Sequence, residues 1–557
     1  MRPNFTLNLG VSYSYQQMTK GSRDQALNSI ASVPGLLVFD VPKTQTKNFA
    51  PKFGFAWSPN YTEGLLGRVF GGSGKSSIRA GFSMGYDYIF DNLWVLSSPP
   101  QLQQTRDCPD VTQPFCPGTG FLASGGIPGT AAPTGSAAEA RAATTSFIPD
   151  QKVPYSLTWT GSYQRQFRND WALELRYVGT RGIHLITQNR INVLPKVAPE
   201  VGLSGLPTFL SDPSLATAGA LSLNLHTIDL RPRIDPVYAN AGFTSSVVAF
   251  LSNGNSTYHG GSAEVTKRFS NGFQMTSAYT FSHLIDDTTA EVFSTVLSPR
   301  RVQDFRNLRA ERASSALDHR HRFVTSWIYE LPWGKNSNGW TKTALSGFNI
   351  AGTYTYETGE RITLRSGTDA NLNGDSAGDR AILNAAGQEG VGSEVCARTA
   401  TLQYVSSTGV IGSSPNLCSS APGSAAETAA IALAARTATV MYVARDPNAK
   451  YIEAGQGAVS SIGRNTFLLP AINNWDLSLF KNFRFGESKY IQVRADFFNA
   501  FNHPQYVPGS VNTVDPIATT GLTTLNQVAP LTDDFLHPSQ VLSSNPRVLQ
   551  LALRFNF

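Results

Sequence analysis

The feature that most constrains this chain is a period-two alternation of apolar and polar residues, which indicates β-strands with two different faces. In the segment 171–187, Leu173, Leu175 and Tyr177 share one face, while Arg176 lies on the other. The alternating segments run to roughly 11–17 residues, longer than the 5–6 residues usual in soluble domains. The strands predicted from this pattern are 3–17, 48–58, 76–90, 154–167, 171–187, 257–269, 272–286, 319–332, 346–358, 473–485, 489–501 and 546–557.

The connections between these strands alternate between short and long. The short ones include Arg168-Asn169-Asp170 and the turn at 270–271 before Gly272, with a third at 486–488. The long insertions lie at 188–256, 287–318, 359–472 and 502–545, with a further cysteine-bearing one between the third and fourth strands. Bacterial outer-membrane barrels have short periplasmic turns and long extracellular loops. The alternation therefore predicts that every long loop lies at one end of the sheet.

The composition agrees with strands in a membrane. Charged residues make up only 15% of the chain, against about 25% in typical soluble domains. No stretch approaches the ~20 apolar residues that a helical span needs, and lipid offers no partner to an open sheet edge. We therefore predict an all-β fold, an antiparallel transmembrane β-barrel with apolar faces toward outer-membrane lipid and charged faces toward the lumen. The expected interfacial aromatic residues are Tyr13, Tyr15, Trp57, Tyr86, Tyr88, Trp171, Trp333 and Trp475.

The net charge of +6 is a weak signal for a nucleic-acid partner. Seven arginines lie between Arg300 and Arg322, but Asp304, Glu311 and Asp318 are mixed among them. Aromatic and basic residues do not alternate there as they do in a single-strand-binding groove. We predict a solvated loop and no nucleic-acid partner.

The four cysteines form two local pairs, Cys108 with Cys116 and Cys396 with Cys418, both in predicted loops. Neither pair has the C-x-x-C-like spacing of a zinc site. Paired loop cysteines suit an oxidising exterior, so we predict two loop disulfides.

The two ends of the chain also bear on the prediction. The final strand carries Phe555 and the terminal Phe557 on one face and Arg554 on the other. A terminal aromatic residue on such a strand resembles the C-terminal signal of outer-membrane barrels, although any β protein can end on a strand. At the other end, Met1 runs into the first strand without the charged and apolar regions of a signal peptide. We expect a chain truncated at its N-terminus.

Two longer motifs make a family resemblance recognisable. The first is D-H-R-H-R-F from Asp318, followed by Y-E-L-P-W-G from Tyr329. The second is N-W-D-L-S-L-F-K-N-F from Asn474, followed by R-A-D-F-F-N-A-F-N-H-P from Arg494. Together they resemble the Oar-like β-barrel of TonB-dependent receptors, and the layout agrees along the whole chain.

The resemblance implies a barrel of 22 strands in the outer membrane of a Gram-negative bacterium, filled by an N-terminal plug that contacts the TonB complex. No plug, TonB box or preceding domain is found in this sequence. Residues 1–557 are therefore expected to be a partial TonB-dependent receptor barrel domain, with about twelve strands of the full set. The TonB complex is an expected partner through the plug region.

Three shorter motifs suggest chemistry. The segment 69–76 has Val69 where a phosphate loop needs Gly and opens no helix, so we predict a turn. His319 and His321 share a strand face but lack a third zinc ligand. Asp369 to Asp375 has the oxygen spacing of a calcium loop, yet its twelfth position is Arg380 and not Glu. A polar Asx-rich turn is the favoured interpretation there and calcium the alternative. We predict no catalytic residue, cofactor or metal site.

The favoured functional hypothesis is a TonB-dependent transporter that takes up a bulky or scarce nutrient, whose identity the sequence does not give. A passive porin-like pore is the first alternative. A surface structural or adhesion barrel, with the long loops as its working part, is the second. An outer-membrane enzyme is the least favoured hypothesis, since no G-x-S-x-G or H-E-x-x-H motif occurs.

Overall fold

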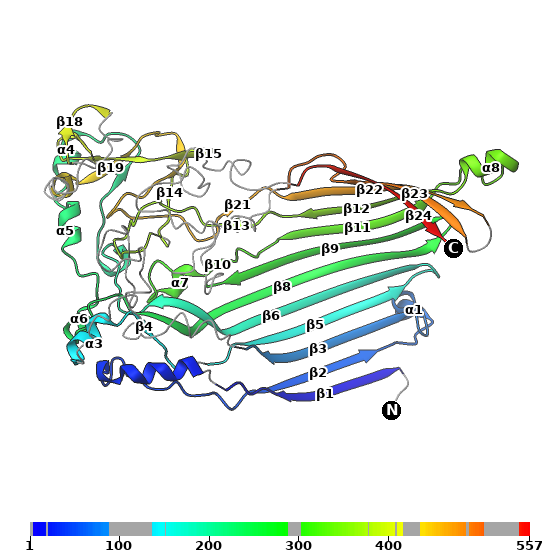
Figure 1. Ribbon diagram of the computed structural model, residues 1–557, viewed down its shortest axis with the longest axis horizontal. Helices are drawn as coiled ribbons and strands as arrows, with labels where there is room; N and C mark the ends of the chain where they lie inside the picture. Colours follow the sequence, from blue (N-terminus) through cyan, green and yellow to red (C-terminus); the bar gives the residue numbers. More distant parts are fainter. Residues whose placement is uncertain are drawn as a thin grey trace, which may run out of the picture.

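The structure, a computed structural model, describes residues 4–17, 20–88, 136–150, 152–287, 302–376, 378–406, 409–415, 435–485, 489–505 and 545–557. Its main feature is one large antiparallel sheet, seen along the right of Figure 1. The long strands of this sheet follow one another in chain order. They are β1 (Phe5–Tyr13), β2 (Phe49–Trp57), β3 (Ser76–Tyr86), β5 (Tyr155–Gln166), β6 (Trp171–Arg190), β8 (Val248–Ser270), β9 (Phe273–Asp286), β11 (His321–Glu330), β12 (Phe348–Glu357), β22 (Ile472–Arg484), β23 (Tyr490–Phe498) and β24 (Val548–Asn556).

Every predicted strand corresponds to one of these strands, so the all-β fold and the antiparallel order are confirmed. The main difference is the length of β6 and β8, which were predicted to end at 187 and to begin at 257. They continue to pair as far as Arg190 and Val248, with register shifts near Leu185. This extension carries the β6–β8 ladder beyond the neighbouring strands, toward the end where the long connections lie (Figure 1).

The register of the sheet keeps apolar residues beside apolar residues. Val493 lies opposite Leu553, whereas Gln492 lies opposite Arg554 on the other face. The outward apolar row is exposed, with Leu551 at 74%, as a lipid-facing band requires. The face separation read from the sequence is thus present in the sheet.

Lys481 interrupts one of the apolar rows. Lys481 lies opposite Val493 and Phe348, yet its side chain is only 7% exposed. Its ammonium group donates to the carbonyl oxygen of Ala344 and lies 4.3 Å from the centre of the Phe348 ring. The aliphatic stem therefore packs along the apolar row, while the charge reaches the polar turn at the strand end.

Short turns join the strands at one end of the sheet. Asn271 and Gly272 have φ of 51° and 76°, which is the left-handed pair that a type I′ hairpin turn requires. Two other turns on this side contain the short helices α1 (Gly64–Phe70) and α8 (Gly339–Leu345). The predicted turn at 486–488 lies outside the described residues. Both chain ends lie on this side in Figure 1.

The long connections fold together at the opposite end, where we call their described residues in 20–48, 136–150, 191–247, 302–320 and 358–471 the cap (Figure 1). Its helices are η1 (Lys20–Ala31), α3 (Ala137–Ala143), η3 (Pro199–Val201), α4 (Leu215–Gly219), α5 (Leu225–Asp229), α6 (Pro236–Asn240) and α7 (Leu308–Glu311). Its strands are β4 (Ser146–Phe147), β7 (Thr208–Phe209), β10 (Ala313–Ser314), β13 (Arg361–Ile362), β14 (Ile382–Leu383), β15 (Gln388–Ser393), β16 (Val395–Arg398), β17 (Tyr404–Val405), β18 (Ile411–Gly412), β19 (Met441–Ala444), β20 (Ala449–Ile452) and β21 (Phe467–Leu468).

The cap has hydrophobic clusters of its own. One cluster combines Leu206 and Ile228 with Tyr442 and Ala458, which come from two different connections. Another packs Phe39 against Phe243. Pairing between β7 and β19 likewise joins the two connections, because Thr208 lies beside Tyr442. The segments predicted as loops are therefore parts of one folded unit.

No helix in the described part of the chain is long and apolar enough to cross a membrane.

Candidate functional site

The cap contains a cavity of about 530 Å³. Its walls come from three connections, at 195–200, 303–310 and two stretches of 358–471, so it exists only because these connections pack together. The lining mixes apolar groups, such as Val197 and Val459, with the acidic side chains of Glu200 and Asp304. Cavities of this size, with apolar walls and a few polar groups, are typical of small-molecule sites.

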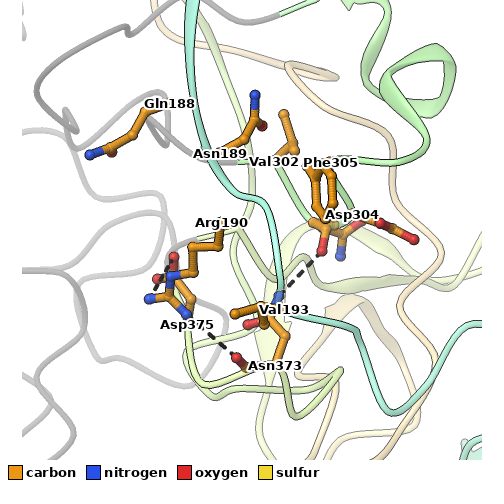
Figure 2. A pocket seen from close by; sticks show the side chains of 10 residues that line it. Gln188, Asn189, Arg190, Val193, Val302, Asp304, Phe305, Asn373 and Asp375 are labelled. Atoms are coloured by element: carbon orange, nitrogen blue, oxygen red, sulfur yellow. Dashed lines mark hydrogen bonds and ion pairs between the residues drawn. The ribbon is translucent and has the colours of Figure 1, made fainter. Parts of the chain in front are cut away.

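A second, much smaller cavity of about 20 Å³ lies beside the end of β6 (Figure 2). Arg190 forms an ion pair of 3.2 Å with Asp375 and points a second nitrogen at the carbonyl oxygen of Asn373, 3.4 Å away. Asp304 lines both this cavity and the larger one. The smaller cavity has room for about one water molecule. The contacts of Arg190 with Asp375 and Asn373 hold the 369–379 segment against the extended strand β6.

The described residues of the 369–379 segment form a tight turn closed by their own side chains. The Asp369 carboxylate accepts hydrogen bonds from the backbone N–H groups of Asn373 (3.1 Å) and Gly374 (2.7 Å). Asn371 accepts from the same Asn373 N–H at 3.0 Å. Leu372 and Gly374 both have left-handed φ, at 57° and 81°. This is an Asx-rich turn, the favoured interpretation of the sequence.

Asp379 is completely buried behind this turn. One carboxylate oxygen accepts from the Ala370 N–H at 3.1 Å, while the other, Oδ1, has no hydrogen-bond partner among the described residues. Burial, reinforced by the nearby charges of Asp369 and Asp375, raises the pKa of Asp379 well above its usual value. The described residues hold no group of three His, Cys, Asp or Glu side chains placed to bind a metal ion. The oxygen groups of this turn are a mixture of carboxylates and amides.

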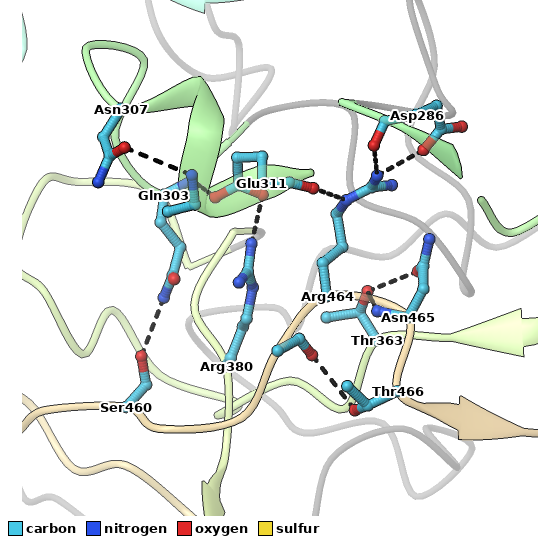
Figure 3. Close-up of polar contacts among 12 residues, drawn as sticks. Asp286, Gln303, Asn307, Glu311, Thr363, Arg380, Ser460, Arg464, Asn465 and Thr466 are labelled. Atoms are coloured by element: carbon cyan, nitrogen blue, oxygen red, sulfur yellow. Dashed lines mark hydrogen bonds and ion pairs between the residues drawn. The ribbon is translucent and has the colours of Figure 1, made fainter. Parts of the chain in front are cut away.

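A buried ion-pair network connects the cap to the large sheet (Figure 3). Arg464 bonds to Asp286 at the end of β9 and donates to the carbonyl oxygen of Glu311 at 2.8 Å. The Glu311 side chain in turn pairs with Arg380. The backbone N–H of Gln303 donates to the Glu311 carboxylate at 3.3 Å, and the side-chain amide of Gln303 donates to the Ser460 hydroxyl at 3.0 Å. The network therefore joins two connections and a strand end in a single set of contacts.

The histidine motif lies where β11 begins. Asp318, fully buried, bonds to Arg320 (3.2 Å) and to Arg361 (3.1 Å). His319 pairs with Glu357 at 3.2 Å, whereas the His321 ring bonds to the hydroxyl of Tyr279. The two histidines thus have different partners and do not converge on one site.

The remaining sequence motifs fall as follows. Segment 69–76 runs from the last residues of α1 through a turn at 71–75 to the first residue of β3, and it opens no helix, as predicted. Cys396 is disulfide-bonded; its predicted partner Cys418, and the pair Cys108 and Cys116, lie outside the described residues. Arginines between Arg300 and Arg322, where a solvated loop was predicted, form ion pairs, such as Arg312 with Asp287 at 3.7 Å.

The sheet and its connections define a class of protein. An antiparallel succession of long strands, an exposed apolar band, short turns at one end and long connections at the other are the properties of outer-membrane β-barrels. The chain belongs to the outer membrane beta barrel domain family, whose model matches residues 1–531. Its location is the outer membrane of a Gram-negative bacterium.

Several solved structures are similar to the chain. The outer membrane transporter YddB from Escherichia coli has 9% identity and a TM-score of 0.34, over 92% of this chain and 41% of that one. The ferripyoverdine receptor of Pseudomonas aeruginosa has 8% identity and a TM-score of 0.32, over 92% and 34%. The FrpB iron transporter from Neisseria meningitidis (F3-3 variant) has 9% identity and a TM-score of 0.33, over 92% and 40%. This chain spans less than half the length of these proteins. No curated protein matches it.

Proposed function

We propose that the chain forms the barrel wall and cap of a TonB-dependent transporter that takes up a bulky or scarce nutrient. The observation that carries this proposal is the cap. Its connections do not stand apart as loops but share hydrophobic clusters, such as Leu206 with Tyr442, and a buried ion-pair network. A receptor needs a preformed surface for its cargo, and the packed connections supply one, whereas a passive pore needs only an open channel.

The cavity of about 530 Å³ is the proposed first contact with that cargo. It lies in the part of the protein expected to face the medium, and its walls combine apolar groups with Glu200 and Asp304. The Glu200 carboxylate would bind donor groups of the cargo, and Asp304 would present the ion pair that it forms with Arg306. Val197 and Val459 would cover the apolar parts of the cargo. The proposed activity is transport and not catalysis.

Energy for uptake would come from the TonB complex through a plug inside the barrel, as the family resemblance implies. The wall offers charged lumen-side groups for such a plug, including Glu174 and Arg176, which bond to each other in the structure. The outer-membrane lipid, the TonB complex and the cargo are therefore the proposed partners.

The test uses the complete gene in its native bacterium. Deletion should abolish uptake of one nutrient in a screen of labelled compounds, and collapsing the proton-motive force should abolish it equally. The variants Glu200→Ala and Asp304→Ala should weaken cargo binding, whereas Asp446→Ala, at an exposed turn of the cap, should not. Uptake that persists without the proton-motive force would favour the porin-like pore instead. A loss of surface attachment with all uptake intact would favour the adhesion barrel.

A further inference from the structure

The turn at 369–379 contains oxygen groups at the spacing that calcium loops use. Such loops take ligands from their first, third and fifth positions and need a glycine at the sixth. Here those positions are Asp369, Asn371, Asn373 and Gly374. The backbone has the matching shape, because Leu372 and Gly374 both have φ angles in the left-handed region. Leucine rarely adopts this conformation.

Two oxygen atoms at this turn are buried without a hydrogen-bond partner among the residues that the structure describes. They are Oδ1 of Asn373 and Oδ1 of Asp379. Both side chains are more than nine-tenths buried. The second oxygen of Asp379 accepts from the Ala370 N–H, which fixes the carboxylate against the turn. An unpartnered buried carboxylate oxygen is costly unless a ligand satisfies it.

Arg380 occupies the twelfth position, where a calcium loop of the usual kind has Glu, and this argued against calcium in the sequence. The structure removes that objection. Arg380 turns away from the loop and pairs with Glu311, and the preceding residue, Asp379, supplies the buried carboxylate instead. The acidic ligand is therefore displaced by one position along the chain.

We propose that this turn binds one Ca²⁺ ion, held by Asp369, Asn371, Asn373 and Asp379. Two carboxylates and two amide oxygens form a hard, all-oxygen ligand set of the type that calcium prefers. The side chain of Asp375 is not assigned as a ligand, because Arg190 already pairs with it. Calcium also suits the site better than Mg²⁺, which demands near-ideal octahedral geometry and gives up its water reluctantly.

The ion would join several cap segments around the large cavity. The Asn371 carbonyl oxygen accepts from the N–H groups of Lys196 (2.8 Å) and Val197 (3.2 Å). The amide nitrogens of Asn371 and Asn373 both approach the Gln303 carbonyl oxygen, at 3.4 and 3.2 Å. Three cap segments therefore meet at this turn, and Asn371 itself lines the cavity. Calcium would order the cavity wall through these contacts.

The test is calorimetric titration of the complete protein in detergent with CaCl₂, after EDTA treatment. We expect one saturable site with a dissociation constant on the order of 10⁻⁵ to 10⁻³ M, as in sensor and extracellular calcium loops. Asp379→Asn should weaken binding by at least about tenfold. Asn373→Ala, which removes an orphaned oxygen without a change of charge, should weaken it as well. Asp446→Asn is the matched control, since Asp446 bonds to the N–H of Asn448 in another cap turn.

Hydrogen exchange separates a binding defect from a folding defect. Calcium should slow exchange of the Asn373 and Gly374 amides in the parent protein but not in Asp379→Asn, while heat-modifiable mobility on gels shows that both are folded. The proposal would be overturned by a folded parent protein that shows no saturable calcium binding. Binding by Asp379→Asn at parental strength, or equal affinity for Mg²⁺, would also overturn it.

Discussion

Replacing Arg380 with Met tests whether the buried ion pair with Glu311 holds the cap together. Both side chains are almost fully buried, at 6% exposure for Arg380 and 3% for Glu311. Removing one partner of such a pair leaves an uncompensated buried charge, which costs about 3–5 kcal/mol. Since about 1.4 kcal/mol is a tenfold change in an equilibrium constant, local opening of the cap should become roughly 10²- to 10⁴-fold more frequent.

The assay is hydrogen exchange followed by mass spectrometry on peptides from 302–315 and 359–376. The double variant Glu311→Leu with Arg380→Met should recover most of the lost protection, because an apolar pair of similar volume is often as stable as a buried ion pair. Lys450→Met is the control, since its ion pair with Glu389 is substantially exposed and is worth about 1 kcal/mol or less. The reasoning is refuted if Arg380→Met exchanges like the control, or if the double variant is no better than the single one.

Three other perturbations have defined outcomes. Burial raises the pKa of Glu453 to about 7, so the folded cap favours the protonated carboxyl. The stability from this preference is fully present below the usual carboxyl pKa and is lost as the pH rises through 7. Glu453→Gln should therefore raise the free energy of unfolding of the cap at pH 8 by up to about 3 kcal/mol, measured as resistance to protease, and change it little at pH 5. Leu551→Arg, in the outward row, should destabilise folding by about 2–4 kcal/mol if it lies near mid-bilayer, whereas Gln550→Arg should be tolerated on gels that report heat-modifiable mobility. Cys396→Ser should cost the cap about 2–4 kcal/mol, and mapping of non-reduced peptides should find Cys396 joined to Cys418.

The strands were predictable because each one carries its own signal. Alternation such as Leu173, Glu174 and Leu175 is local, and the Asn271-Gly272 turn requires no knowledge of the rest of the chain. The length of β6 was underestimated, since its last residues alternate poorly and are strands only because β8 pairs with them. Pairing with a distant segment leaves no pattern in a single strand.

The cap was not predictable for the same reason. Leu206 and Tyr442 belong to one hydrophobic cluster although more than two hundred positions of sequence separate them, and neither lies in a periodic segment. In the 369–379 turn, the spacing of the first ligands was visible in the sequence. The displaced acid at Asp379 was not, because only the folded chain shows that Arg380 points elsewhere.

The pairing of β12 with β22 has a consequence for the order of assembly. Glu357 lies opposite Ile472, so the sheet holds together the two ends of the whole 358–471 segment. Bringing together the ends of a free loop on the order of 100 residues costs about 4 kcal/mol of chain entropy. Once β12 has paired with β22, the ends of that connection are already together, so this entropy is lost before the cap folds. The cap should therefore mature late, on a barrel whose strands have already found their neighbours, and the same cap sequence released from the sheet should collapse without reaching this arrangement.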